Sequence, residues 1–175
     1  MLTEPLPTHL DVRKAVTRGL NVTGSLKTTD LPRFLPLLAG AEGKIWVEMR
    51  FSRDEERRSL LHLAIDADII VSCQRCLDAM PLHITSNSTL ALVWSDEEAS
   101  HLPKFLEPLI VKESTCDLRH VVEDELILSL PAFNYHKLDD CNLKTADYSD
   151  PDPDHGLGKE KSNPFNVLEH LKSGK

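Results

Sequence analysis

Three consecutive stretches of the chain alternate apolar and polar residues with a period of two, and this alternation constrains the fold more than any other feature. The stretches are GKIWVEMRF at 43–51, SLLHLAIDADIIVS at 59–72 and PLHITSNSTLALVW at 81–94, the last with an expected kink or bulge at 86–88. Such alternation is typical of half-buried strands. Because no helical stretch separates these strands, the sequence predicts an α+β fold built on a curved, barrel-like antiparallel sheet.

Shorter patterns predict the elements around this sheet. An edge strand is expected over 18–26, and a further strand over 107–111. Residues 31–39 are compatible with a short helix interrupted by Pro36. The acidic run SDEEAS at 95–100 is expected to form a solvated turn.

The composition changes after residue 141. Residues 142–162 combine prolines, glycines and aspartates with few apolar side chains, which predicts a flexible acidic linker. Residues 163–175 begin with Asn-Pro and bring Phe165 and Leu168 to three-residue spacing, as in a short amphipathic helix that docks on the domain or on a partner. The remaining part, residues 1–141, is then expected to form a single α+β domain.

The formal net charge of −8 is concentrated in one segment. Residues 113–155 hold 11 acidic and 3 basic side chains, whereas the rest of the chain holds 17 of each kind. Because a nucleic-acid-binding module normally has a basic face, this balance favours a basic protein as partner over RNA alone. A local basic cluster is still present at Arg53, Arg57 and Arg58.

Membrane and secretion signals are not apparent in the sequence. No run reaches the ~18–20 apolar residues that span a bilayer, and the first residues do not resemble a signal peptide. We therefore expect a cytoplasmic protein whose four cysteines are free thiols or metal ligands.

The stretch CQRC at Cys73–Cys76 joins the second and third predicted strands and leaves three interpretations open. Two thiolates at this spacing can chelate zinc, but a structural site needs two further ligands, for which Cys116, His136 and Cys141 are candidates. A redox pair normally lies at the start of a helix in a βαβ unit, which this context lacks. The third interpretation is a hairpin turn with small buried side chains. In each case Arg75 lies on a rigid turn, where it could bind phosphate or carboxylate.

A helix is predicted between residues 117 and 130, because Asp117 is a suitable N-cap and Pro131 a suitable stop. Glu125 falls inside its apolar face, so this carboxylate must reach water, pair with a cation or have a raised pKa. One hypothesis pairs Glu125 with Arg75, which would tie the helix to the CQRC turn. The apolar face gathers Leu118, Val121, Val122, Leu126 and Leu128.

Known catalytic patterns are missing from the sequence. It contains neither a GxSxG nucleophile motif nor a glycine-rich phosphate loop. The sequence therefore favours a binding protein without a small-molecule substrate. The alternative function is a small zinc- or thiol-dependent enzyme that uses CQRC.

Three stretches in this order resemble the bacterial YceD family, known as large ribosomal RNA subunit accumulation protein. They are VSCQRCLDAMPLHI, VEDELILSLPAFNYH with Cys141 following shortly after, and SNPFNVLEHLK at the end. LPKFLEPLIV, between the first two, fits as well. The resemblance covers most of the chain from about residue 60 onward.

The resemblance implies a non-enzymatic cytoplasmic factor in ribosome biogenesis, needed for the synthesis, processing or stability of large-subunit (23S) ribosomal RNA. Some relatives carry further cysteines near the C-terminus that suggest zinc, whereas here only Cys141 remains in that region. The best metal-ligand set is then Cys73, Cys76, His136 and Cys141.

Two mechanisms are compatible with an acidic protein that acts on ribosomal RNA. In the first, Arg75 converges with the basic cluster on one face and contacts RNA or its precursor directly. In the second, which we favour, the acidic segment and the terminal helix bind a basic ribosomal or processing protein. The candidate contact residues are Gln74, Arg75, Arg53, Arg57, Arg58, Glu125, Phe165 and Leu168.

Overall fold

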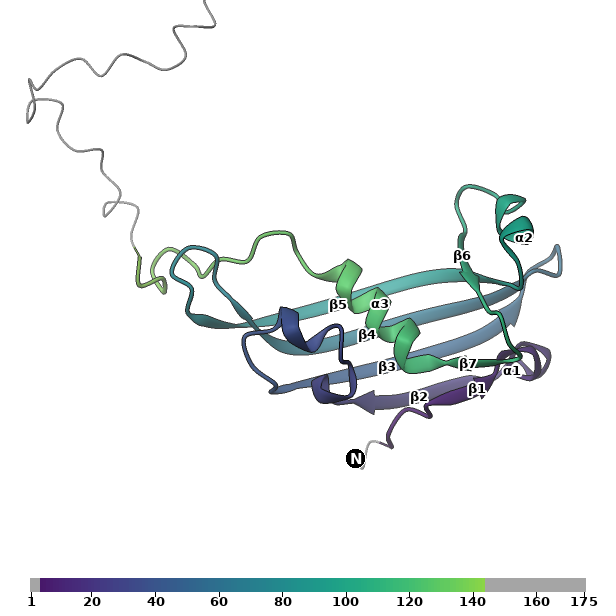
Figure 1. Ribbon diagram of the computed structural model, residues 1–175, viewed down its shortest axis with the longest axis horizontal. Helices are drawn as coiled ribbons and strands as arrows, with labels where there is room; N and C mark the ends of the chain where they lie inside the picture. The colour runs from purple at the N-terminus through teal and green to yellow at the C-terminus, as the bar shows by residue number, and fades with distance from the viewer. Residues whose placement is uncertain (1–3, 144–175) are drawn as a thin grey trace, which may run out of the picture. The chain divides into compact units, whose positions relative to one another are not determined.

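The three alternating runs form the three longest strands of a five-stranded sheet in the computed structural model, which describes residues 4–143 (Figure 1). The strand order is β2-β3-β4-β5-β6, and all neighbours are antiparallel except β5 and β6, which are parallel. The strands are β2 (Asn21–Leu26), β3 (Gly43–Arg53), β4 (Ser59–Ser72), β5 (Ala79–Val93) and β6 (Glu107–Ile110).

The α+β class is confirmed, but the barrel-like closure is wrong. In the described part of the chain, β2 and β6 form opposite edges of an open sheet and are not paired with each other. A barrel closes by pairing its edge strands, whereas here helix α3 covers one face of the sheet (Figure 1). The core therefore lies between sheet and helix instead of inside a closed cylinder.

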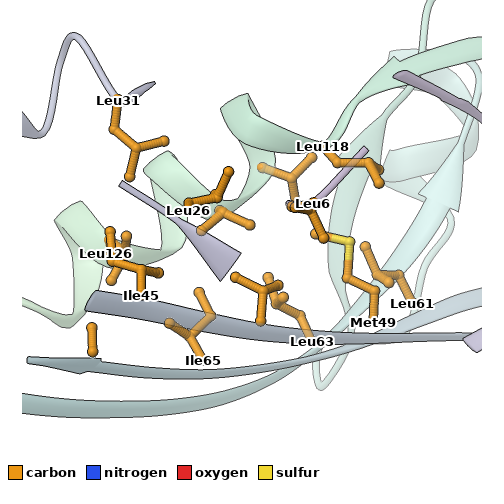
Figure 2. Packing of buried hydrophobic residues seen from close by; sticks show 14 of the residues in the cluster. Leu6, Leu26, Leu31, Ile45, Met49, Leu61, Leu63, Ile65, Leu118 and Leu126 are labelled. Atoms are coloured by element: carbon orange, nitrogen blue, oxygen red, sulfur yellow. The ribbon is translucent and has the colours of Figure 1, made fainter. Parts of the chain in front are cut away.

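Helix α3 (Leu118–Ser129) begins where the sequence predicts it. The Asp117 side chain caps it by accepting a hydrogen bond from the Arg119 N–H at 2.9 Å. Leu118 and Leu126 face the apolar side chains of the sheet, among them Met49 (Figure 2). Leu128, which we assigned to the same face, is 77% exposed. The buried face therefore ends at Leu126 and does not include Leu128.

The predicted bulge at 86–88 is absent. The β4–β5 register is unbroken from Ser72 opposite Ala79 to Ser59 opposite Leu92. Ser86, on the face toward α3, donates a hydrogen bond from Oγ to Glu125 Oε1 at 2.5 Å.

The remaining elements are short. The region expected to hold one helix over 31–39 instead contains one 3₁₀ turn, η2 (Leu35–Leu37), and a second 3₁₀ turn, η1 (Thr28–Asp30), comes before it. The expected acidic turn contains a single helical turn, α2 (Asp96–Ser100), which the Ser95 side chain caps. Near the N-terminus lie β1 (His9–Asp11) and α1 (Val12–Arg18), and β1 pairs with β7 (Thr115–Asp117).

The predicted terminal helix at 163–175 and nearly all of the linker at 142–162 lie outside the described residues. The division of the chain into a domain, a linker and a terminal helix stays a prediction. Among the helices of residues 4–143, none is long and apolar enough to cross a membrane.

Gly24 in β2 provides a test of how the N-terminal segment is held. A Cβ at Gly24 would lie 2.7 Å from both Cα and N of the buried Leu6, whose N–H donates to the Ser25 carbonyl at 3.1 Å. Gly24→Ala must push this segment away, so we expect a loss of about 1–3 kcal/mol in the free energy of unfolding. Denaturant titration would measure it.

Gly40→Ala is the matched control, because a Cβ there would meet only Ile70 Cβ at an ordinary 3.9 Å. We expect this control to change stability little. Equal denaturation midpoints for the two variants would contradict the close approach of the Leu6 backbone to Gly24.

Candidate metal centre

The first half of the site is the turn between β4 and β5. Cys73 follows the last residue of β4, and its N–H donates to the Asp78 carbonyl at 2.9 Å while its carbonyl accepts from the Leu77 N–H at 2.8 Å. These bonds close a tight loop around Cys76. Leu77 has φ 65°, a left-handed conformation that is uncommon for a residue with a side chain.

The second half is the segment that follows α3. It lies against the turn because the Gln74 N–H donates to the Asn134 carbonyl at 2.8 Å and Gln74 Nε2 donates to the Ala132 carbonyl at 3.3 Å. Asn142 Nδ2 donates to Asp78 Oδ2 at 2.6 Å. Gln74, which the sequence offers as a partner contact, thus binds the chain's own backbone.

These contacts bring together the four ligands that the sequence suggests. One donor atom each from Cys73, Cys76, His136 and Cys141 lies within 4.8 Å of all the others. Cys76 Sγ is 3.3 Å from His136 Nδ1. Zinc bonds of about 2.0–2.3 Å put neighbouring tetrahedral ligands roughly 3.5–4 Å apart, so the set fits a zinc ion with little adjustment.

The protonation chemistry also suits a metal. Burial raises the pKa of the Cys73 thiol, but the backbone N–H groups of Cys76, His136 and Arg75 lower it to about 6. Burial raises the pKa of Cys76. Backbone N–H groups directed at sulfur stabilise a thiolate, which is the form that binds zinc.

Cys116, the other candidate ligand, lies elsewhere. It is in β7 opposite Leu10, outside the cluster of four, and burial raises the pKa of its thiol. The fourth member of the cluster is Cys141 because the segment after α3 returns to the CQRC turn, whereas β7 precedes α3.

The hypothesis that Glu125 pairs with Arg75 is wrong. Glu125 binds Ser86 on β5, and the Arg75 guanidinium lies over the ring of Tyr135, 5.3 Å from its centroid. Arg75 Nη1 is buried without a hydrogen-bond partner in the described part of the chain. Arg75 is therefore held by an aromatic ring and keeps an unused donor.

The predicted convergence of Arg75 with the basic cluster is also wrong. Arg53 ends β3 and pairs with Ser59 at the start of β4, whereas Arg75 follows the end of β4. The whole 14-residue strand separates them. Arg58 is moreover neutralised by ion pairs, with Nε 2.5 Å from Asp54 Oδ2.

Sequence reasoning missed a group of exposed apolar side chains around the CQRC turn. Phe133 and Tyr135 are 69% and 48% exposed, with parallel rings 6.5 Å apart, and Leu77 is 78% exposed. We call Arg75, Leu77, Phe133 and Tyr135 the rim. The sequence signal that could have identified this surface is the pair of aromatic residues at alternate positions in PAFNYH. Two other predicted contacts, Phe165 and Leu168, lie outside the described residues.

Comparison with known proteins gives a consistent result. The family model described as "Large ribosomal RNA subunit accumulation protein YceD" matches residues 61–172. A Haemophilus influenzae protein with the same description is 29% identical over 168 residues, which is 95% of this chain and 96% of that protein. No solved structure shows significant similarity.

Proposed function

Because the chain belongs to the YceD family of large ribosomal RNA subunit accumulation proteins, we propose that it supports the accumulation of large-subunit ribosomal RNA by binding. The observation that supports a binding role is the rim, an exposed apolar and aromatic surface where the segment after α3 meets the CQRC turn. In this proposal the protein acts in the cytoplasm, where ribosomal subunits assemble, and has no catalytic reaction of its own.

Zinc is proposed as the cross-link of this corner. Three sulfur ligands and one nitrogen ligand complete a tetrahedral set, and structural zinc sites have four protein ligands. A catalytic zinc keeps one position open for water or substrate, so this ligand set favours a structural ion over the enzymatic alternative. Bound zinc would fix the CQRC turn to the segment after α3 and so hold the rim in place.

Three features of the rim favour a protein partner. Leu77 has a strained backbone and an exposed side chain, and such strain is found at functional sites more often than elsewhere. Aromatic residues and arginine are enriched in protein interfaces. The Arg75 guanidinium, which lies over the Tyr135 ring, places such an arginine beside the exposed aromatic rings.

The charge near the rim indicates the kind of partner. Residues 113–155, which include the segment carrying Phe133 and Tyr135, contain 11 acidic and 3 basic side chains. A basic ribosomal or processing protein with exposed apolar residues matches this combination of charge and apolar surface. Phe165 and Leu168 would extend the contact if the C-terminal segment also binds.

A complementation experiment tests the rim. The double variant Leu77→Gly and Tyr135→Ala should fold normally, because glycine relieves the positive φ and the tyrosine is half exposed. In cells that lack the endogenous protein and express this variant, we expect the ratio of large-subunit to small-subunit ribosomal RNA to stay low. Cross-linking followed by mass spectrometry should recover a basic protein with the natural protein but not with this variant.

Trp46→Ala is the matched control, because Trp46 is an exposed aromatic residue (41%) on the sheet face opposite α3. We expect this control to complement fully. Full complementation by the rim variant as well would contradict the proposed function of the rim.

A further inference from the structure

A surface with several arginines lies at the other end of the sheet, away from the candidate metal centre. A pocket of about 610 Å³ opens where α1 ends, β2 begins and β3 ends. Three arginines line it, Arg18, Arg50 and Arg53, and no aspartate or glutamate from the described part of the chain is among its lining residues. Thr17 and Ser52 add neutral hydroxyl groups.

The backbone around this pocket is well ordered by hydrogen bonds. Arg50 pairs with Asn21 across β3 and β2, and the Phe51 N–H donates to the Leu20 carbonyl at 2.9 Å. The carbonyls at the end of α1 are already occupied, since Ala15 accepts from the Leu20 N–H at 3.0 Å. Arg18 lies in the last turn of α1, and some of the carbonyls at this end of the helix already accept hydrogen bonds.

The three arginines have no carboxylate partner among residues 4–143. Among the ion pairs of the described residues, none involves Arg18, Arg50 or Arg53, whereas Arg33 and Arg58 each bind two carboxylates. All three lining arginines are exposed. An arginine without an internal partner can bind an external anion without first breaking an ion pair.

Two titratable groups lie near Arg50 on the open face of the sheet. Glu48 is two residues back along β3, and His62 is directly opposite Arg50 on β4. Burial lowers the pKa of His62, and the charge of Arg50 lowers it further. Glu48 is the one carboxylate on β3 and lies on the same strand face as Arg50, but it is not among the described residues that line the pocket.

We propose that the pocket formed by Arg18, Arg50 and Arg53 binds phosphate groups of RNA. Guanidinium groups match phosphate geometry and remain charged, and three exposed arginines at one end of the sheet suit neighbouring phosphates of a polynucleotide. The choice of RNA among polyanions rests on the proposed function, but the pocket itself is independent of the metal centre.

Fluorescence anisotropy with the full-length zinc-loaded protein and a labelled single-stranded RNA tests this site. We expect binding at low salt that weakens as salt rises. The triple variant Arg18→Gln, Arg50→Gln and Arg53→Gln should bind at least about 10-fold more weakly and lose about 2 from the slope of log K against log salt, since each phosphate contact contributes about 0.7. The triple Arg-to-Lys variant should retain most of that slope.

Arg58→Gln is the matched control, because Arg58 lies on the adjacent hairpin and is already ion-paired. We expect it to bind RNA like the natural protein. The proposal is overturned if the natural protein does not bind RNA at low salt, if the triple Gln variant binds equally well, or if polyglutamate binds as tightly as RNA. The rim variant should still bind RNA in this assay, so a failure of the rim and a failure of this pocket are distinguishable.

Discussion

Elemental analysis of the purified protein is expected to find one zinc per chain, and removal of that zinc is expected to have a large effect on the corner formed by residues 73–78 and 131–143. Apparent binding free energies of structural zinc reach about 10–16 kcal/mol in small zinc domains. Here the sheet has its own core, so the apo protein should keep its strands while the corner opens. Hydrogen exchange should accelerate at the N–H of Gln74, which bonds to Asn134.

The stability change can be measured by thermal unfolding with and without a chelator. At free zinc about 1,000 times Kd, linkage predicts about 4 kcal/mol of stabilisation. Cys76→Ser should abolish most of this zinc-dependent difference, because it removes one of the four ligands. Cys116→Ser is the matched control, since Cys116 lies outside the cluster and should leave zinc content unchanged.

Thiol titration adds a second measurement. With zinc bound, Cys73, Cys76 and Cys141 should resist alkylation, and a chelator should make them reactive. A protein that contains no zinc and whose cysteines react at once without chelator would contradict a structural metal site.

The strands of the sheet were predictable because the long runs alternate largely in phase with burial, most regularly in β3. In β3, Ile45, Val47 and Met49 face the core while Trp46 and Glu48 face solvent. The alternation decides which residues share a face, and this is sufficient to place each strand. It does not decide whether edge strands meet, so the open sheet could not be distinguished from a barrel.

The metal-ligand set was predictable in part. The spacing of CQRC identifies two ligands, but His136 and Cys141 come from a segment without regular secondary structure. Their position depends on backbone hydrogen bonds between Gln74 and residues 132 and 134, which leave no periodic pattern in the sequence. For the same reason, the exposed aromatic residues of the rim were not identified.

The buried carboxylate was assigned to the wrong residue. Helical periodicity puts Glu125 inside the apolar face of α3, whereas Glu123 is the fully buried one. Glu123 faces the loop between η1 and η2, not the sheet, and periodicity within one helix carries no information about a loop 90 residues earlier. Only the tertiary fold brings Arg33 and Phe34 to Glu123.

Glu123→Gln is expected to destabilise the fold by about 3–5 kcal/mol, which corresponds to a decrease of roughly 10 °C in Tm. Glu123 Oε1 accepts hydrogen bonds from the N–H groups of Arg33 at 2.6 Å and Phe34 at 3.1 Å, and Oε2 accepts from Arg33 Nε at 2.9 Å. A neutral amide presents its NH₂ group to one of these donors and leaves it unsatisfied in the interior. Thermal and urea unfolding measure the loss.

Asp124→Asn is the matched control for this prediction. Asp124 binds the same arginine, at 2.7 Å from Nη1, but its side chain is 60% exposed. Exposed ion pairs contribute about 0–1 kcal/mol, so the control should change stability little. Equal losses for the two variants would show that burial of Glu123 is not the cause.

The pH dependence of the Glu123→Gln effect follows from the same contacts. Burial raises the pKa of Glu123, but the N–H groups of Phe34 and Arg33 and the Arg33 side chain lower it below 4.5 overall. A carboxylate with a depressed pKa stabilises the fold above its ordinary pKa, and this contribution disappears as pH falls through the folded value. The stability difference between natural protein and variant should therefore be constant near neutral pH and decrease below about pH 4.5. Because other carboxylates titrate equally in both proteins, a difference that stays constant down to pH 3 would contradict an ionised Glu123 as the source of this stability.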